Sequence, residues 1–395
     1  MKVLVINAGS SSLKFQFMES DTANVLAKGL CERIGIDGSM TYTGAGDKVR
    51  KEIPMTTHKE AIAAVLEILT SEKDGVVEDM SAIDAVGHRV VHGGEKFSSS
   101  AVIDAEVKDA IRDCIPLAPL HNSANLMGIE ACEEVMPETK MVAVFDTAFH
   151  QTMPEKAFMY ALPYKYYKEN AVRRYGFHGT SHDYVSREAA KALGKNVEDL
   201  KIVTCHLGNG SSITAVDGGK SVDTSMGMTP LAGVPMGTRT GDVDPAIIKY
   251  LMDVDQDLDI HAIDRIFNKE SGVYGVSGVS SDFRDLDNAV EEGNKRAELA
   301  LDMFSYQVRK YIGSYATAMG GLDAIVFTAG VGENSANVRA DVINGLDFLG
   351  ASIDEEKNQV RGELAIVSPD ESKVKVLVVP TNEELVIALE TARLV

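Results

Sequence analysis

Short runs of apolar, β-branched residues alternate along this chain with longer segments in which apolar residues recur every three or four positions. The short runs predict buried strands, and the periodic segments predict amphipathic helices. Strands separated by helices in this way indicate an α/β protein whose sheets are largely parallel and covered on both faces. The expected strands are Lys2–Ile6, Ile83–Val91, Met141–Phe145, Lys201–Cys205, Ala324–Phe327 and Val374–Val379.

Local signals predict where several helices begin and end. Thr57 and Glu60 form a capping box ahead of an apolar stripe with helical spacing. Apolar residues at helical spacing predict a long helix over Ala297–Met319. The two glycines that follow predict its end. Thr381 and Glu384 predict a second capping box, which opens the last helix of the chain.

Two segments of the chain repeat the same pattern. Residues 3–15 and 202–216 each contain an apolar strand, a turn of small polar residues and an alternating strand. Each segment therefore predicts a β-hairpin with a small polar tip. Two such hairpins at the heads of similar-sized halves predict a duplicated domain whose tips face one cleft. A third glycine turn is expected after a strand at 325–334, and the domain boundary within the turn-rich stretch 150–163.

The amino-acid composition limits the kinds of partner and cellular location that we expect for this protein. The 395 residues favour two or three domains, and 39 basic against 59 acidic residues give a net charge of −20. This excess of negative charge repels phosphates, so we expect neither a nucleic acid nor an anionic membrane as partner. The four cysteines are far apart, which favours buried free thiols in a reducing cytoplasm over a zinc site or disulfides. No apolar run is long enough for a signal peptide or a membrane span, so we expect a cytoplasmic protein.

The two hairpin tips are candidate phosphate sites. Glycine lets backbone N–H groups approach an anion closely, and serine hydroxyls add donors without bulk. Either tip alone is better explained as a plain tight turn, but the pair favours a nucleotide cleft. The candidate residues are Asn7, Gly9, Ser10, Ser11, Ser12 and Lys14 in the first tip and Asn209, Gly210, Ser211 and Ser212 in the second.

Two short motifs resemble signatures of other nucleotide enzymes. Gly219-Lys220-Ser221 matches the end of a P-loop, but the leading glycine is replaced by Thr214, and the segment is typical of a hairpin turn. Asp282 begins an Asp-Phe-Arg tripeptide that resembles a protein-kinase motif without the catalytic loop that accompanies it. Neither of these classes fits the chain.

Several charged residues lie at strand ends or in glycine loops. Arg89 and Arg239 present planar forks that match carboxylate or phosphoryl oxygens, although a single arginine is also explained by a structural salt bridge. His178 precedes a helix expected over residues 181–193 and is either a phosphoryl-directed donor or a hydrogen-bonded core histidine. Asp146 and Glu383 follow strands and are candidates for magnesium or substrate binding, since Glu384 already serves the capping box.

Taken together, these motifs resemble the acetate kinase family, within the group that shares the actin, hexokinase and sugar-kinase fold. The resemblance covers essentially the whole chain. It rests on seven blocks in order, at residues 7–14, 87–94, 145–150, 173–182, 206–212, 236–242 and 327–335.

The resemblance implies two duplicated actin/hexokinase-like (ribonuclease H-like) α/β domains with an inter-domain cleft. The first would comprise residues 1–149 with the C-terminal helix 384–395, and the second, residues 150–383, would bind nucleotide and form a homodimer. The implied reaction is reversible, Mg²⁺-dependent, in-line phosphoryl transfer from ATP to acetate, giving acetyl phosphate and ADP, with Mn²⁺ as a possible substitute. An ionised carboxylate needs no general base, only relief from repulsion between two anions.

The resemblance also implies roles for individual residues. The catalytic set is Arg89, Asp146, His178 and Arg239, and the acetate-binding set is Arg89, Val91, Leu120, Phe177 and Pro230. The residues expected to bind nucleotide are Lys14, His206, Leu207, Gly208, Asn209, Gly210, Asp282, Phe283, Arg284, Gly330, Val331, Gly332, Glu333 and Asn334. The residues expected to bind magnesium are Asn7 and Glu383. The alternatives are a kinase for propionate or another short acyl acceptor and, from another class, a nucleotide-driven switch ATPase.

Overall fold

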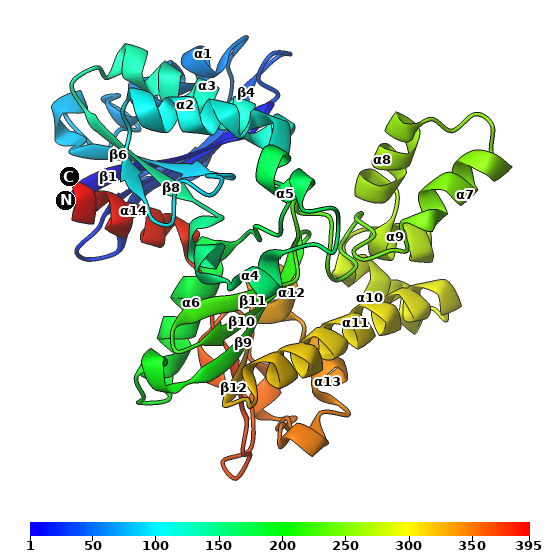
Figure 1. The fold of residues 1–395 in the computed structure, drawn as a ribbon. Coiled ribbons are helices and arrows are strands. Elements are labelled where there is room, and N and C mark those ends of the chain that lie inside the picture. The colour runs from blue at the N-terminus through cyan, green and yellow to red at the C-terminus, as the bar shows by residue number, and fades with distance from the viewer. The chain divides into compact units, whose positions relative to one another are not determined.

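The computed structural model describes all residues from 1 to 395 except for the side chain of Leu120. The chain forms two compact units (Figure 1). Unit 1 contains Met1–Gln151 and Asn382–Val395, and unit 2 contains Thr152–Thr381. The C-terminal segment therefore returns to the unit in which the chain begins, and each unit is built around its own sheet.

Unit 1 contains an 8-stranded sheet in the order β5-β4-β3-β2-β1-β6-β8-β7. The three strands β1, β6 and β8 are parallel, and every other pairing is antiparallel. The strands are β1 (Lys2–Ala8), β2 (Ser12–Glu19), β3 (Asn24–Glu32), β4 (Ser39–Thr43), β5 (Val49–Glu52), β6 (Ala85–Val90), β7 (Ala101–Val102) and β8 (Lys140–Phe145).

Unit 2 contains a 6-stranded sheet in the order β11-β10-β9-β12-β14-β13. Here β9, β12 and β14 are parallel, while β10, β11 and β13 pair antiparallel with their neighbours. The strands are β9 (Lys201–Leu207), β10 (Ser211–Asp217), β11 (Lys220–Thr224), β12 (Ala324–Thr328), β13 (Ala365–Ile366) and β14 (Lys375–Val378).

The two sheets share one topology. In each, a first strand pairs with the second, the second with the third, and two further strands continue in parallel on the other side: β3-β2-β1-β6-β8 and β11-β10-β9-β12-β14. This correspondence agrees with the sequence repeat. The expectation of largely parallel sheets is wrong, because each unit opens with hairpins, and strands joined by a tight turn must run antiparallel.

In unit 1, helices cover both faces of the sheet (Figure 1). Helices α1 and α3 pack on one face, and the C-terminal helix α14 packs on the other against β1, β6 and β8. Gly87 of β6 permits this close approach, since a methyl group there would lie 2.4 Å from Oγ1 of Thr391. The helices are α1 (His58–Leu69), α2 (Ala105–Asp113), α3 (Pro119–Val135) and α14 (Glu383–Leu394), with short 3-10 turns η1 (Met80–Ala82), η2 (Ile115–Leu117) and η3 (Ala148–Thr152).

In unit 2, α11 packs on β9 and β10, and α6 packs on β9 and β12. Helices α7 and α8 stand away from this sheet (Figure 1). The helices are α4 (Glu155–Phe158), α5 (Lys165–Asn170), α6 (Gly179–Ala192), α7 (Ala246–Val254), α8 (Ile260–Lys269), α9 (Gly272–Ser277), α10 (Phe283–Glu291), α11 (Lys295–Met319), α12 (Ala329–Asn334) and α13 (Ala336–Ile343), with η4 (Val197–Asp199), η5 (Asp347–Leu349) and η6 (Lys357–Gln359).

Most of the local expectations are confirmed. Each expected strand is present within about two residues, and Thr57 caps α1. The segment that resembles a P-loop is a hairpin between β10 and β11. Its turn residues are Gly218 and Gly219, whose φ angles of 60° and 74° suit a tight hairpin. The long helix ends where expected, with Gly320 as its left-handed C-cap at φ 67°.

Two local expectations are wrong. The last helix is capped by Asn382, whose side chain accepts a hydrogen bond from the N–H of Leu385, so Thr381 and Glu384 do not form the expected capping box. The glycine-rich segment after β12 forms the short helix α12 instead of a turn. Helix α6 (Gly179–Ala192), by contrast, agrees with its expected bounds within about two residues. A helix begins where its free N–H groups find acceptors, and tertiary contacts help to decide that position.

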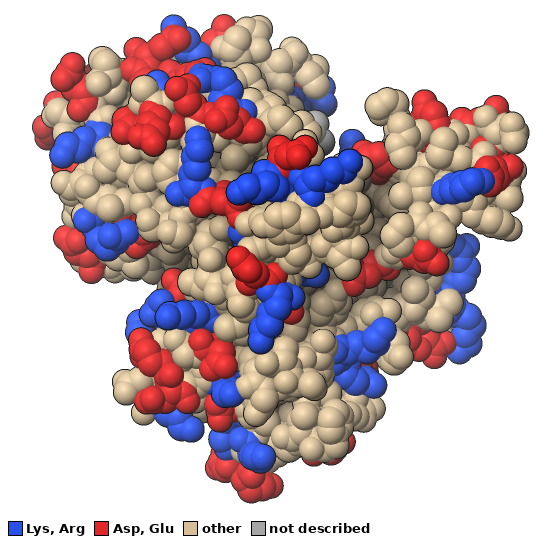
Figure 2. Space-filling model, in the orientation of Figure 1, with Lys and Arg blue, Asp and Glu red and all other residues tan. Residues whose placement is uncertain are grey.

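The cysteines and the surface agree with the composition. All four cysteines are buried free thiols, and burial raises the pKa of Cys31 to about 12 and that of Cys114, chiefly by the same cause, to about 11. Among the described residues, no helix combines the length and apolar character needed to cross a bilayer. Acidic and basic side chains are interspersed over the face shown in Figure 2.

Candidate active site

Arg89 and Asp146 meet at the carboxyl ends of two adjacent parallel strands of unit 1. Arg89 lies near the end of β6, and Asp146 directly follows β8. The guanidinium donates from Nε to Oδ1 of Asp146 at 3.1 Å and from Nη2 to Oδ2 at 2.5 Å. The side chain of Asp146 is only 2% exposed, so the carboxylate holds the arginine in one orientation.

Carboxylates surround the Arg89 guanidinium. Burial acts to lower the pKa of Arg89, but the negative charges of Asp146, Glu383 and Glu384 outweigh it and raise the pKa above its ordinary value. Arg89 therefore stays charged at every pH at which the protein is folded. Asp146 occupies the edge formed by Nε and Nη2, so a substrate anion would have to meet the other edge of the guanidinium.

Two asparagines of α3 support the loop that follows β6. The side-chain oxygen of Asn125 accepts from the N–H of Val91 at 3.0 Å, and its amide donates to the carbonyl of Ala8 at 2.9 Å. Asn122 likewise bonds both the N–H and the carbonyl of His92. Both asparagines are buried. Our sequence reasoning missed them; their spacing of three residues within an apolar helix was the available signal.

A small cavity of about 60 Å³ in unit 1 brings together the two predicted metal ligands. Asn7 at the end of β1 and Glu383 at the start of α14 both line it, together with Gln16 and Arg89. Oε1 of Glu383 is buried and has no hydrogen-bond partner among the described residues. A buried carboxylate oxygen without a donor is costly unless a cation or water completes it.

These oxygens suit magnesium better than a softer metal. Mg²⁺ binds one or two carboxylate or amide oxygens and keeps several waters or substrate phosphates. Among the described residues, no group of three or more His, Cys, Asp and Glu side chains is close enough to hold a metal alone. Asn7 and Glu383 therefore fit Mg²⁺ as a partial ligand set that bound phosphates would complete.

Lys14 does not point freely into solvent. It is the register partner of Asn7 across the first hairpin, and its ammonium forms an ion pair with Glu384 of α14. The carboxylate that was expected to cap the last helix thus holds Lys14 at the same cavity. An anionic phosphate would compete with Glu384 for this ammonium group.

The tip of the second hairpin, in unit 2, has the close-packed backbone expected of a glycine loop. The N–H of Gly208 donates to the carbonyl of Gly210, and the N–H of Gly237 donates to the carbonyl of Asn209 at 3.1 Å. A methyl group on Gly237 would lie 2.0 Å from Oδ1 of Asn209. A side chain on Gly237 would therefore displace Asn209 from its place beside the tip.

Arg239 and His178 both lie beside this tip. A methyl group on Gly210 would be 3.5 Å from Nη1 of Arg239 and 3.7 Å from Nε2 of His178. Arg239 donates to the carbonyl of Pro230 at 3.0 Å and has no carboxylate partner among the described residues. Burial lowers the pKa of Arg239 from its ordinary value. A half-buried guanidinium without a counter-ion beside a glycine tip is an anion-binding arrangement.

His178 is held in an uncommon backbone conformation. It precedes α6 with a φ of 56°, a left-handed conformation that is uncommon for non-glycine residues. Its ring stacks on that of His206 with centroids 4.0 Å apart, and its Nδ1 lies 2.8 Å from Oγ of Ser212. The ring is therefore fixed both by stacking and by a hydrogen bond.

Apart from Lys14 of unit 1, the residues predicted to bind nucleotide lie in unit 2 and fall into two groups. The first lies at the ends of the parallel strands β9 and β12, where a methyl group placed on Gly208 would lie 3.8 Å from Cβ of Ala329 at the start of α12. Leu207 is fully buried and His206 nearly so. Oε1 of Glu333 accepts from the N–H groups of Ala329 and Thr381. The group also contains Gly330, Val331, Gly332 and Asn334, all within α12.

The second group is the start of α10. Asp282 caps this helix and forms a two-point ion pair with Arg284, whose side chain is 88% exposed. Hydrogen bonds from Arg284 lower the pKa of Asp282 to about 2. Phe283 packs in the core against Phe304, so only its backbone could contact a ligand.

The residues expected to line an acetate pocket are apolar and mostly buried. Val91 is 5% exposed in unit 1, and Phe177 is 2% exposed in unit 2. Pro230, also in unit 2, is half-buried, and its carbonyl accepts from Arg239. Leu120 lies outside the described side chains.

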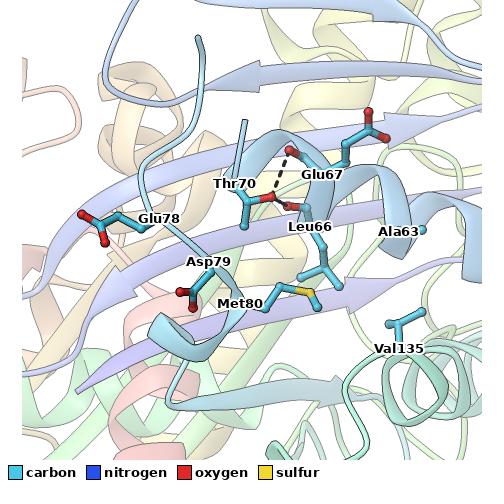
Figure 3. Close-up of a pocket in the computed structure, with 8 residues that line it drawn as sticks. All are labelled: Ala63, Leu66, Glu67, Thr70, Glu78, Asp79, Met80 and Val135. Carbon is cyan, nitrogen blue, oxygen red and sulfur yellow. Dashed lines mark hydrogen bonds between the residues drawn. The ribbon is translucent and has the colours of Figure 1, made fainter. Parts of the chain in front are cut away.

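A larger cavity of about 600 Å³ lies elsewhere in unit 1 (Figure 3). It lies between α1, the segment before β6 and the end of α3. It contains none of the predicted site residues, since it is lined by Ala63, Leu66, Glu67, Thr70, Glu78, Asp79, Met80 and Val135.

Comparisons with known proteins agree with this arrangement. The model of the acetokinase family matches residues 2–389. The acetate kinase of Thermoanaerobacterium thermosaccharolyticum is 60% identical, with 100% of this chain and 99% of the relative covered. The acetate kinase of Methanosarcina thermophila is 58% identical, with 100% and 97% covered.

Solved structures give the same result. The crystal structure of Porphyromonas gingivalis acetate kinase has a TM-score of 0.96 at 49% identity, with 99% of both chains covered. A propionate kinase from Francisella tularensis has a TM-score of 0.93 at 42% identity, with 100% of both chains covered. The chain therefore belongs to the acetokinase family.

Proposed function

We propose that this protein is an acetate kinase, which transfers the γ-phosphoryl group of ATP to acetate in a reversible, Mg²⁺-dependent reaction. The observation that carries the proposal is Arg239, a half-buried guanidinium without a carboxylate partner among the described residues, which lies with His178 beside the tip at Gly210. The identity of about 60% to curated acetate kinases over the whole chain supports acetate as the acceptor.

The reaction needs charge neutralisation more than proton transfer. A carboxylate with a pKa near ~4–5 is already ionised at pH 7, so no general base is required. One acetate oxygen bonds to the γ-phosphorus, the bond from that phosphorus to the bridging oxygen breaks, and ADP leaves with the electron pair. Arg239 and His178 are suited to hold the transferring oxygens, and the outer edge of Arg89 to hold the acetate carboxylate. Val91, Leu120, Phe177 and Pro230 would receive the methyl group.

Magnesium would be held by Asn7 and Glu383 together with nucleotide phosphates. When bound, the ion would neutralise the phosphate charge, and Mn²⁺, which prefers the same oxygen ligands, would substitute. The unsatisfied Oε1 of Glu383 supports this assignment. Asp146 would act through Arg89, whose orientation it holds. Lys14 would turn from Glu384 toward the phosphates.

We assign nucleotide binding to residues 150–383, through the backbone at 206–210, the start of α10 and helix α12. Gly208 and Gly210 in this backbone and Gly330 and Gly332 in α12 leave room for a phosphate chain. The buried reduced thiols support a reducing, cytoplasmic location.

We also propose a homodimer formed through this second domain. Helix α7 has no buried residue, although its sequence is strongly apolar. Helix α11 exposes a stripe at helical spacing formed by Leu299, Met303 and Tyr306. Such surfaces are seldom left open to water on a monomer. The exposed apolar side chains of α7, α8 and α11 are Ile247, Tyr250, Val254, Ile260, Leu299, Met303 and Tyr306.

The decisive experiment is a series of kcat/KM measurements over formate, acetate, propionate and butyrate with ATP and Mg²⁺. We expect acetate to give the highest value and ATP turnover to require the acid. A higher value for propionate would favour the alternative represented by the Francisella propionate kinase, since one methylene changes binding by only ~1–3 kcal/mol. Rapid ATP hydrolysis indifferent to any acid would overturn the proposal in favour of a switch ATPase.

A further inference from the structure

A chain of buried hydrogen bonds runs from the core of unit 2 to His178. Oγ1 of Thr204 lies 2.7 Å from Nδ1 of His182, and Nε2 of the same ring lies 2.7 Å from Oγ of Ser212. That hydroxyl lies 2.8 Å from Nδ1 of His178. Thr204, His182 and Ser212 are all fully buried. Three side chains thus connect the sheet to the ring beside the glycine tip.

The fold brings these groups together from three elements. Thr204 is on β9 and Ser212 on β10, and each strand presents its side chain to the face covered by α6. His178 and His182 lie one helical turn apart at the start of α6, where side chains at i and i+4 share a face. Both rings therefore reach the same hydroxyl.

Thr204 determines which atom donates and which accepts in this series of hydrogen bonds. Its hydroxyl has no hydrogen-bond partner other than His182 among the described residues. If the histidine donated to it, the threonine proton would be buried without an acceptor, which costs more than an unused oxygen lone pair. The threonine therefore donates to Nδ1 of His182, and the proton of that neutral ring lies on Nε2.

The donor and acceptor at Ser212 follow from the same argument. Its oxygen accepts from Nε2 of His182, which leaves its own proton to be donated to Nδ1 of His178. We propose that Thr204, His182 and Ser212 are positioning residues that hold His178 as a neutral imidazole with its proton on Nε2. This inference rests on the proposed function, because it gives His178 the N–H that a transferring phosphoryl group requires.

The surrounding charges favour the neutral ring as well. Within unit 2, the titratable and charged groups near His178 include His182 from α6, His206 from β9 and Arg239 from the loop before α7. A guanidinium nearby disfavours a second positive charge. Nδ1 of His206 lies 2.8 Å from Oγ of Ser181, so a second hydroxyl is placed to hold the stacked ring. Protonating His178 would also leave the Ser212 proton without an acceptor.

The first test is spectroscopic and does not depend on turnover. In protein labelled with ¹⁵N-histidine, we expect the Nδ1 signal of His178 to be that of an unprotonated nitrogen, and the Nε2 signal that of an N–H, from pH 6 to 8. The signals are assigned by their loss in His178→Gln. A His178 protonated on Nδ1 at pH 7, alone or as the imidazolium, overturns the proposal.

The second test compares Ser212→Ala with Thr214→Val. Thr214 lies on the same strand two residues away, is equally buried, and its hydroxyl contacts only Thr224. We expect Ser212→Ala to lower kcat by about tenfold, as loss of an orienting partner commonly does, with Ser212→Cys in between and Thr214→Val near wild type. Without the serine donor, Nδ1 of His178 can carry the proton instead of Nε2, so the neutral ring becomes a mixture of tautomers.

The tautomer of the variant separates positioning from simple damage to the fold. In Ser212→Ala at pH 8, we expect the ¹⁵N signals of both ring nitrogens of His178 to show partial protonation, as in a mixture of the two neutral tautomers. A His178 that keeps the wild-type tautomer in Ser212→Ala, or an equal loss of kcat in Thr214→Val, overturns the positioning role. If wild-type protein lacks acetate-dependent turnover, the proposed function fails, while the histidine signals still decide the hydrogen-bond chain.

Discussion

The guanidinium of Arg89 and the carboxylate of Asp146 form a two-point ion pair, with Nε 3.1 Å from Oδ1 and Nη2 2.5 Å from Oδ2. The pair joins the ends of neighbouring parallel strands, so the sheet itself fixes its geometry. One edge of the Arg89 guanidinium is therefore occupied by the carboxylate of Asp146. The other edge is held in a fixed direction, which lowers the entropic cost of binding a substrate carboxylate.

Replacing either member of this pair should affect acetate more than ATP. We expect Arg89→Ala to raise the KM for acetate by about tenfold or more, because a charge-assisted contact is lost, while the KM for ATP changes little. Asp146→Asn should lower kcat and raise the KM for acetate, since the arginine is no longer held. Steady-state kinetics with each substrate varied in turn measure both effects.

The control for this pair is Asp113→Asn, which disrupts an exposed ion pair with Lys96 in the same unit. It should leave both KM values unchanged, because exposed pairs contribute little. A larger change in the KM for ATP than for acetate in Arg89→Ala would reject the assignment.

Arg239→Ala should abolish most of the turnover without unfolding the protein. The arginine has no carboxylate partner among the described residues, so its removal leaves no buried charge unpaired. We expect kcat to fall by about 10²–10³-fold, as when one transition-state donor is lost. Coupled assays measure turnover, and circular dichroism checks the fold. Arg265→Ala, which breaks an exposed pair with Glu270, is the matched control. Near-normal turnover in Arg239→Ala would show that the transferring group is held elsewhere.

Glu383→Gln should change the requirement for magnesium. The substitution keeps the shape of the side chain but removes its charge, so we expect the Mg²⁺ concentration for half-maximal activity to rise by about tenfold or more. Titration with Mg²⁺ at fixed ATP measures this shift. Glu390→Gln on the same helix, where the carboxylate pairs with Arg393, should not change it. Equal Mg²⁺ requirements in the two variants would place the metal on other residues.

His88 should make unit 1 less stable in acid. Burial lowers the pKa of His88 to about 3, and its Nε2 has no hydrogen-bond partner among the described residues. Below the unfolded-state pKa of ~6.5 the unfolded chain takes up a proton that the folded chain does not. Stability is therefore lost as the pH falls from about 6.5 toward 3, by about 2 kcal/mol between pH 7 and pH 5.

Unfolding by guanidinium chloride at pH 7 and pH 5 measures this loss. In His88→Phe we expect the difference between the two pH values to shrink by about 2 kcal/mol. His261→Gln, at an exposed position of α8, should leave it unchanged. The explanation is wrong if His88→Phe retains the full difference.

The exposed stripe of α11 should be the dimer contact. Tyr306 is 55% exposed and shares the stripe with Leu299 and Met303. We expect Tyr306→Glu to convert a dimer into a monomer, because a buried charge without a partner is costly. Light scattering coupled to size-exclusion chromatography measures the mass. Tyr164→Glu, at a residue 63% exposed outside α7, α8 and α11, should remain dimeric. A monomeric wild-type protein would contradict the proposed homodimer.

The local pattern of the chain was enough to predict its central strands. Apolar β-branched runs such as Met141–Phe145 and Ala324–Phe327 are buried on both faces of a sheet, so their character depends little on distant residues. The glycine blocks indicated the tip at Gly210, because close backbone approach leaves a direct compositional signature. Helix starts were less predictable. Asn382 and Thr381 are both good caps, and the N–H of Thr381 is instead bonded to Glu333, far away in sequence.

The sequence by itself determined the strands, the repeated hairpins and the types of residue available for anion chemistry, since these follow from local spacing and side-chain chemistry. Only the tertiary structure decided which partners those residues take. Asp146 holds Arg89, Glu384 holds Lys14, and Arg239 has no carboxylate partner among the described residues. Ion pairs and hydrogen-bond chains join residues far apart in sequence, and their directions depend on register and burial, which no local pattern records.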